Sequence, residues 1–269
     1  MTGAGPLLAI DTAASQCGAA ILVDGRVAAE RLELMSRGQA ERLMPMIAEL
    51  LAELSLAPRD LRAVAVCEGP GNFTGIRIAV AAARGLALST GRPALGVGRL
   101  DALAETEAWG LGLRLSGGTP DAAPLRLLAT AEARRGEILA QPFEIHAGEA
   151  PRALAPLTQG EAETLVPALA EALASSPVPG PVRVCGPDAP RISAMLEAAG
   201  LAVALGDLGD MADPASIGRL AGAALDRLAA EETPPPPAPR YPRPADAAPS
   251  RETPPPLLAP TPLPDTPAR

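Results

Sequence analysis

A glycine-rich stretch between two apolar segments constrains the fold of this chain most. Residues 67–77 read CEGPGNFTGIR; the segment before them, 61–66, has the length of a buried strand, and the alanine-rich segment 76–88 has the length of a helix. The sequence therefore predicts a strand, a tight loop and a helix in succession. Exposed N–H groups at a helix N-terminus favour an anion, whereas most Gly-Pro-Gly turns only reverse the chain, so both interpretations stay open.

Strands and helices alternate on both sides of this stretch, which predicts an α/β fold. Asp24-Gly25 lies between two apolar runs and predicts a hairpin, because a type I′ turn requires positive φ at both central positions. Asp213-Pro214 supplies an N-cap and a first helical residue, and so predicts the start of the last helix. Further strands are expected at 7–10, 94–97, 125–130, 137–143, 182–185 and 201–205, and further helices at 99–108, 161–174, 191–199 and 215–230.

Three regions are expected along the chain: an N-terminal lobe over 1–115, a smaller C-terminal lobe over 116–230 and a proline-rich tail over 231–269. A loop with glycine and proline at 116–124 marks the boundary between the lobes. The tail holds 15 prolines in 39 residues, and proline lacks an N–H and fixes one dihedral angle. We therefore expect the tail to be polyproline-like or disordered.

Composition excludes several kinds of protein. The net charge is −8 and no basic run occurs, so the chain lacks the positive surface of a protein that binds nucleic acid by itself. Cys17, Cys67 and Cys185 have no Cys-x-x-Cys spacing, which predicts neither disulfides nor a zinc site and fits a reducing cytoplasm. The chain has no signal-like segment and no run of about 20 apolar residues, so a soluble, cytoplasmic protein without a membrane partner is expected.

Two predicted helices carry features of their own. The first has an apolar stripe, and Pro45 places its start either at Pro45 itself or near Gln39 with a kink. The second, 76–88, is rich in alanine and contains Gly85, which costs about 1 kcal/mol relative to alanine inside a helix. Small residues let another helix approach closely, although the overall abundance of alanine explains them equally well.

The residue inventory leaves little room for catalysis. His146 is the only histidine and the chain has no lysine, so a paired-histidine metal site and a Walker loop are excluded. Asp11 ends the first strand, where proteins of the actin, Hsp70 and sugar-kinase superfamily place an aspartate that faces phosphates; a turn aspartate also caps its own loop, and both roles stay open. We predict no catalytic residue and no metal ligand.

Four segments resemble the bacterial TsaB (YeaZ) family. They are Leu8-Ala9-Ile10-Asp11-Thr12, the Asp24-Gly25 hairpin, Arg42-Leu43-Met44-Pro45-Met46-Ile47 and, above all, Gly69-Pro70-Gly71-Asn72-Phe73-Thr74-Gly75-Ile76-Arg77. The resemblance is continuous over residues 6–108, fair around 132–137 and thin over 145–230. Residues 239–246 resemble the family's terminal proline-tyrosine-arginine segment, so part of the tail is expected to lie on the body.

The resemblance implies an actin-like, two-lobed α/β fold of the Hsp70 and sugar-kinase superfamily, with mixed sheets flanked by helices. It also implies a non-catalytic subunit that dimerises with TsaD, the subunit that transfers threonylcarbamoyl to the tRNA adenosine beside the anticodon. A TsaE-like ATPase joins the larger complex, tRNA is reached only through that complex, and a homodimer forms when TsaD is absent. No cofactor is expected on this subunit, with room for ATP or ADP in the assembled complex.

In the family the partner surface is built from the first two helices, here 39–54 and 76–88. We expect the contacts to come from Leu43, Met46, Ile47, Leu50, Ile76, Ala79, Val80, Ala83 and Ala87. The candidate anion-facing or nucleotide-facing residues are Asp11, Thr12, Gly69, Gly71, Asn72, Thr74 and Gly75.

Two positions depart from the family pattern, with Asn72 where serine is usual and Glu132 where aspartate is usual. Asparagine tolerates a left-handed backbone, so the loop is expected to keep its fold. Two rival functions stay open. One is a nucleotide-binding phosphotransferase of the sugar-kinase type, which Asp11 favours, and the other is a glycoprotease-like metallopeptidase, which a single histidine argues against.

Overall fold

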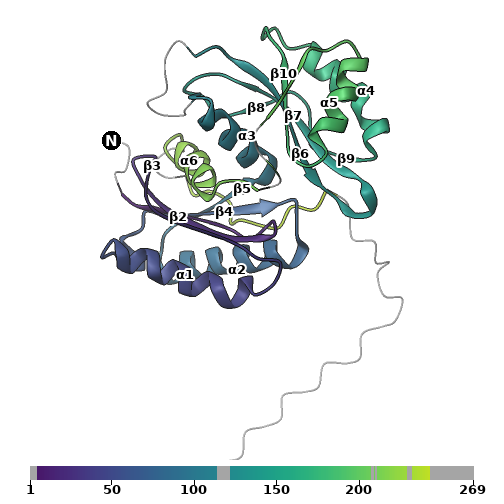
Figure 1. Cartoon of the computed structure of the whole chain (residues 1–269). Coiled ribbons are helices and arrows are strands. Elements are labelled where there is room, and N and C mark those ends of the chain that lie inside the picture. Colours follow the sequence, from purple (N-terminus) through teal and green to yellow (C-terminus); the bar gives the residue numbers. More distant parts are fainter. Residues whose placement is uncertain (1–4, 114–121, 207–208, 210, 229–231, 243–269) are drawn as a thin grey trace, which may run out of the picture.

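Two lobes, each built on a β-sheet flanked by helices, make up the body of the protein (Figure 1). This computed structural model describes residues 5–113, 122–206, 209, 211–228 and 232–242. Most of the loop predicted to join the lobes, 116–124, lies outside the described residues, as does the part of the predicted tail from 243 to 269.

The first sheet has the strand order β3-β2-β1-β4-β5. Strand β1 (Leu7–Asp11) pairs antiparallel with β2 (Gln16–Val23) and parallel with β4 (Ala63–Gly69). The outer strands are β3 (Arg26–Leu34), antiparallel to β2, and β5 (Ala94–Gly98), parallel to β4. The sheet is mixed, as the actin-like prediction has it, and the predicted α/β fold class is confirmed.

The hairpin between β2 and β3 turns at Asp24-Gly25, with φ values of 51° and 74°. Both central residues therefore have the positive φ of a type I′ turn, as predicted. This hairpin sets the register in which β2 and β3 pair, and it places β3 at the edge of the sheet.

Helices cover both faces of the first sheet (Figure 1). Helix α1 (Gln39–Glu53) and helix α2 (Phe73–Thr90) lie side by side on one face, with a short 3-10 turn, η1 (Pro58–Asp60), between them in sequence. Of the two predicted starts for the first helix the earlier one is correct, since α1 begins at Gln39 and contains Pro45. Helices α3 (Arg99–Gly110) and α6 (Pro214–Leu225) cover the other face, between the sheet and the second lobe.

Helix α6 belongs to the first lobe, so the predicted extent of the second lobe, 116–230, is wrong at its C-terminal end. The N-cap prediction is confirmed, because Asp213 Oδ1 accepts a hydrogen bond of 2.8 Å from the Ala215 N–H. The apolar stripe of α6, with Ile217 at its centre, is buried against β1 and β2. Because α1 and α2 cover only one face of the sheet, the other face needs an apolar cover from elsewhere in the chain.

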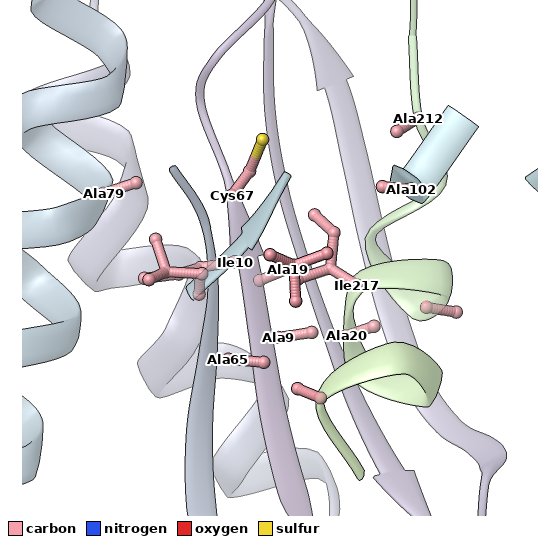
Figure 2. Close-up of a cluster of buried hydrophobic side chains, with 14 of the residues drawn as sticks. Ala9, Ile10, Ala19, Ala20, Ala65, Cys67, Ala79, Ala102, Ala212 and Ile217 are labelled. Atoms are coloured by element: carbon pink, nitrogen blue, oxygen red, sulfur yellow. The ribbon is translucent and has the colours of Figure 1, made fainter. Parts of the chain in front are cut away.

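Small side chains fill the core on both sides of the sheet (Figure 2). Ala9, Ala20 and Ala65 come from β1, β2 and β4, while Ala79 points in from α2 and Ile217 from α6. Alanine at the contact lets a helix axis lie close to the sheet, which explains much of the alanine content without a functional role.

The second lobe is built on a sheet with the strand order β11-β10-β6-β7-β8, and β9 also pairs with β7. The strands predicted at 125–130 and 137–143 are confirmed and pair as the antiparallel hairpin of β6 and β7, and the helix predicted at 161–174 is one helix that contains Pro167. The elements are β6 (Leu125–Glu132), η2 (Arg134–Gly136), β7 (Ile138–Ile145), β8 (Arg152–Ala153), β9 (Thr158–Gly160), α4 (Ala162–Ala174), β10 (Val182–Cys185), α5 (Ala189–Ala198) and β11 (Val203–Leu205).

Residues 232–242, which we call the C-terminal strap, return to the first lobe and pass along β4 (yellow in Figure 1). The expectation that part of the tail lies on the body is confirmed for this segment. Among the helices in the described part of the chain, none combines the length and the apolar character that crossing a membrane requires.

Candidate functional site

The glycine-rich loop packs directly onto the turn that follows β1. Asn72 N donates to Ala13 O at 2.7 Å, and Thr12 Oγ1 donates to Gly75 O at 2.6 Å. A Cβ on Gly71 would overlap the carbonyl oxygen of Ala13, and one on Gly75 would overlap that of Thr12. Glycine is therefore required at both positions because two backbone segments meet there, and no ligand has to be invoked.

The N-terminus of α2 is capped from within the chain. Asn72 Oδ1 accepts from Thr74 N at 3.0 Å and from Gly75 N at 3.1 Å, while Ile76 N donates to Asn72 O at 2.9 Å. Asn72 has φ −58°, so tolerance of a left-handed backbone does not explain how the loop keeps its fold. The side chain acts as an N-cap, a role that serine also fills.

Asp11 is fully buried and faces its own loop. Its Oδ1 accepts from Ala13 N at 2.7 Å and its Oδ2 accepts from Gln16 Nε2 at 2.6 Å. Burial raises the pKa of Asp11 above the ordinary value, while the Ala13 N–H and the charge of Arg99 lower it. Of the two roles left open for Asp11, the structure shows the turn aspartate.

The seven candidate anion-facing residues lie where the glycine-rich loop meets the turn after β1, and their hydrogen bonds are made within the chain. Gly71, Asn72 and Thr74 are exposed, whereas Asp11, Thr12, Gly69 and Gly75 are buried. Gly69, at φ 94°, packs against Ile76. Three of the N–H groups that begin α2 donate within the chain, so the loop presents a closed hydrogen-bond network rather than a cradle.

The residues predicted to contact a partner lie on the side of α1 and α2 that faces the sheet. Eight of the nine are buried against the sheet: Leu43, Met46, Ile47, Leu50, Ile76, Ala79, Val80 and Ala83. Only Ala87 is partly exposed. The prediction is wrong for the eight because an amphipathic helix on a sheet turns its apolar stripe toward the sheet, and those side chains form the core.

The side of α1 and α2 that faces away from the sheet is exposed to solvent. The exposed residues recur at helical spacing and face away from the sheet, and we call them the outer face: Met44, Ala48 and Ala52 of α1, with Phe73, Arg77, Ala81, Gly85 and Leu88 of α2. Leu88 is 88% exposed. Gly85 has no atom within 4 Å of the position of a Cβ, so the fold of the chain gives no reason for glycine there.

Sequence reasoning assigned the partner surface to these two helices through residues that are buried, and it did not name the exposed residues of their outer face. The signal that finds them is the set of positions between the buried ones, where apolar Met44 and Leu88 interrupt an otherwise polar or small surface. Single exposed apolar residues are common on protein surfaces, so the signal is the grouping of such residues on one face of the two helices.

The comparison with family models gives one match that covers half of the chain. A model described as "TsaD: tRNA N6-adenosine threonylcarbamoyltransferase" matches residues 33–174. In sequence, the chain is 39% identical over 132 residues to the "tRNA threonylcarbamoyladenosine biosynthesis protein TsaB" of Escherichia coli, which is 49% of this chain and 52% of that protein. The chain spans about half the length of the curated relatives it matches.

Two solved structures resemble the whole body of the protein. One is a Pseudomonas aeruginosa protein described as similar to peptidase YEAZ, with a TM-score of 0.67 and 27% identity over 89% of this chain and 100% of that chain. The other is YeaZ from Pseudomonas aeruginosa, with a TM-score of 0.63 and 27% identity over 83% of this chain and 93% of that chain.

Proposed function

This chain belongs to the TsaB (YeaZ) family, and from that membership we propose that it is the non-catalytic partner subunit in the synthesis of threonylcarbamoyladenosine in tRNA. It binds a TsaD-like subunit through the outer face of α1 and α2. That second subunit performs the transfer to the tRNA adenosine beside the anticodon, and this chain supplies the surface on which it docks.

The observation that carries the proposal is the outer face itself. Its centre consists of small residues, Ala48 and Ala52 on α1 and Ala81 and Gly85 on α2, and a large apolar residue, Leu88, lies at one end. A surface with a small-residue centre lets a helix of another subunit approach closely. Glycine inside a helix costs about 1 kcal/mol relative to alanine, and nothing within this chain lies within 4 Å of a Cβ at Gly85, so the position leaves room for a helix of another chain to approach closely.

The rest of the site supports a non-catalytic role. The loop that begins α2 uses its N–H groups internally, and Asp11 is held by its own turn. The single histidine, His146, lies in the second lobe with its Nε2 at 2.6 Å from Glu144 Oε1. The rival phosphotransferase and metallopeptidase functions therefore draw little support from these residues.

Other partners follow from the same surface and from the family. A second copy of this chain occupies the outer face when the TsaD-like subunit is absent. The TsaE-like ATPase, tRNA and ATP or ADP reach this chain only through the assembled complex, which acts in the cytoplasm.

Calorimetry with a purified TsaD-like subunit tests the proposal. Ala81→Arg adds a long cation at the centre of the outer face and should weaken binding by at least about thirtyfold, the effect of a hot-spot residue. Ala194→Arg, at an exposed alanine on α5 of the second lobe, is the matched control and should leave the affinity unchanged. Unchanged affinity for Ala81→Arg would overturn the assignment of the outer face.

The non-catalytic role has its own test. Purified chain is incubated with ATP and magnesium, and release of phosphate is followed with and without the TsaD-like subunit. Sustained hydrolysis by this chain alone, lost on Asp11→Ala, would contradict the proposal and favour the phosphotransferase.

A further inference from the structure

The C-terminal strap is held on the body by one buried carboxylate at the end of β4. Glu68 Oε1 accepts from Ala238 N at 2.8 Å, and Glu68 Oε2 accepts from Arg240 Nε at 2.7 Å. The backbone of the same residue takes part as well, since Glu68 O accepts from Arg240 N at 2.8 Å. Glu68 is 6% exposed, so these are sheltered, charge-assisted hydrogen bonds, the stronger kind.

Neighbouring strands leave room for this anchor. A Cβ on Gly96 of β5 would overlap the carboxylate of Glu68, so glycine at 96 is what admits the Glu68 side chain. Arg240 also lies near Asp101 at the start of α3, where burial raises the pKa of Asp101 and Arg240 lowers it. The strap is therefore a built part of the first lobe, and its prolines reduce the conformational entropy that docking costs.

The strap ends in an exposed aromatic and arginine cluster with the first turn of α2. The Tyr241 and Phe73 rings have centroids 5.3 Å apart, and the Arg77 guanidinium lies 3.6 Å from the Phe73 centroid. Arg77 Nε donates to Tyr241 Oη at 2.9 Å. Phe73 is 44% exposed and Tyr241 is 42% exposed, so this cluster presents two rings and a cation to solvent.

The position of the cluster is as informative as its composition. The chain has four aromatic residues; Phe143 is in the core, Trp109 stacks on Arg219, and the other two meet here. Phe73 and Arg77 begin the exposed row on α2 that continues through Ala81 and Leu88. Among the described residues, no carboxylate forms an ion pair with Arg77 within this chain.

We infer that the docked strap completes the partner-binding surface, with Phe73, Arg77 and Tyr241 as its contact at the N-terminal end of α2. The inference rests on the proposed function. The occupant is the TsaD-like subunit, at a place where that subunit presents an apolar side chain to the rings and a carboxylate to Arg77. Aromatic and arginine side chains are the residues that carry most binding energy at interfaces, and the net charge of −8 disfavours a nucleic acid at this cluster.

Glu68 is a positioning residue in this arrangement, because it touches the strap and not the partner. Glu68→Gln keeps the shape of the side chain but turns an amide N–H₂ toward the donors of Ala238 or Arg240, and so weakens the anchor. The variant should lower the affinity for the partner through Tyr241. Limited proteolysis should then cut the strap faster than in the wild type while the body stays folded.

The test compares full-length variants by calorimetry with the TsaD-like subunit. Tyr241→Ala should weaken binding about tenfold while the unfolding midpoint shifts little, and Tyr241→Phe, which keeps the ring, should retain most of the affinity. Leu205→Ala, at a residue 52% exposed on β11, is the matched control and should bind as the wild type does. Adding Glu68→Gln to Tyr241→Ala should cost nothing further, since both act through one contact.

The outcomes separate this inference from the proposed function. If Tyr241→Ala binds like the wild type while Ala81→Arg does not bind, the strap is not part of the interface and the outer face still is. If neither variant changes the affinity, the assignment of the outer face fails together with this inference. If the wild-type chain does not bind the TsaD-like subunit at all, the proposed function itself fails. Loss of binding in Tyr241→Ala with full binding in Glu68→Gln would overturn the role of Glu68 as the anchor.

Discussion

The two sides of the first sheet differ in how completely side chains find partners within this chain. We call the side covered by α3 and α6 the inner side and the side covered by α1 and α2 the outer side. On the inner side, α6 places Arg219 with its Nε at 3.2 Å from Glu105 Oε1 and its guanidinium 3.8 Å from the Trp109 ring centroid. On the outer side, Gly85 has no neighbour and Leu88 is almost fully exposed. The folding of this chain alone thus explains the inner side, whereas the outer side is left exposed, and the proposed docking of a second chain would cover it.

The largest effect is expected on the inner side. Arg219→Ala removes the cation beside Glu105, which is fully buried, and leaves an uncompensated carboxylate. Loss of one partner of a buried ion pair costs about 3–5 kcal/mol, so the free energy of unfolding in urea should fall by that amount. Arg84→Ala, at an exposed arginine of α2, is the matched control and should stay within about 0.5 kcal/mol of the wild type. Equal effects of the two variants would remove the contrast between the sides.

The glycine-rich loop, like the inner side, is packed within this chain, so a substitution there should lower the free energy of unfolding. Gly75→Ala places a methyl group against the carbonyl oxygen of Thr12, which a backbone shift must relieve. Overpacking of this kind costs about 1–3 kcal/mol in the free energy of unfolding, measured by chemical denaturation. A stable Gly75→Ala protein would show that the two loops are not in contact, and the loop would return as a candidate anion site.

A pH dependence is expected from the inner side as well. Burial and a hydrogen bond that protonated Glu30 donates to Asp213 raise the pKa of Glu30 to about 8, although Arg219 opposes the shift. Because the folded state holds this proton more tightly than the unfolded state, the stabilisation is complete below pH 4.5 and is lost as the pH rises through 8. Unfolding free energies measured between pH 5 and 8 should fall, and Glu30→Gln should reduce that fall.

Two neighbouring groups, Glu105 and Asp213, also affect how the unfolding free energy depends on pH. Glu105, whose pKa burial raises to about 7, contributes in the same direction, so a residual fall is expected in Glu30→Gln. Asp213→Asn keeps the N-cap of α6 but removes the neighbouring carboxylate, and it should reduce the fall too. Glu30 is partly exposed and solvent screening limits the effect, so it should be smaller than that of Arg219→Ala. If the unfolding free energy of Glu30→Gln falls with pH as steeply as that of the wild type, a group other than Glu30 causes the fall.

Local signals predicted most of the elements because their causes are local. The Asp24-Gly25 turn, the Asp213-Pro214 helix start and the Asn72 N-cap of α2 each depend on residues within a few positions of one another. Asp11 and the residues of the glycine-rich loop were predicted together as candidate anion-facing residues, and the fold places the loop against the turn that follows β1. What they do there was not predictable, since it depends on hydrogen bonds between distant segments, from Asn72 N to Ala13 O and from Thr12 Oγ1 to Gly75 O.

Long-range packing accounts for the errors. Helix α6 returns to the first sheet because β1 and β2 have a second apolar face, and a stripe such as that of Ile217 does not say which sheet it will cover. The same ambiguity put the predicted interface on Leu43 and Ala83, since an apolar stripe fits a core and a partner equally well. The anchoring of the strap by Glu68 joins residues 172 positions apart, and only the fold reveals it.

The smallest effect on stability is expected at Gly85. This position also tests most directly whether a partner packs against the outer side. Gly85→Ala adds a methyl group where nothing lies within 4 Å, and alanine is the better helix former, so the free energy of unfolding should rise by about 1 kcal/mol. If a partner helix packs closely against this position, the same methyl group should weaken binding to the TsaD-like subunit. The free energy of unfolding is therefore expected to rise while the affinity for the partner falls.

Gly110→Ala is the matched control, since Gly110 is an exposed glycine in α3 that also has nothing within 4 Å and lies away from the outer face. It should leave the affinity unchanged, so a loss confined to Gly85→Ala identifies the contact rather than a general change in α2 or in stability. A Gly85→Ala protein that is more stable and binds as the wild type does would mean that the partner does not approach α2 closely at this turn. The outer face would then have to act through its ends, at Phe73 and Leu88, and not through its small-residue centre.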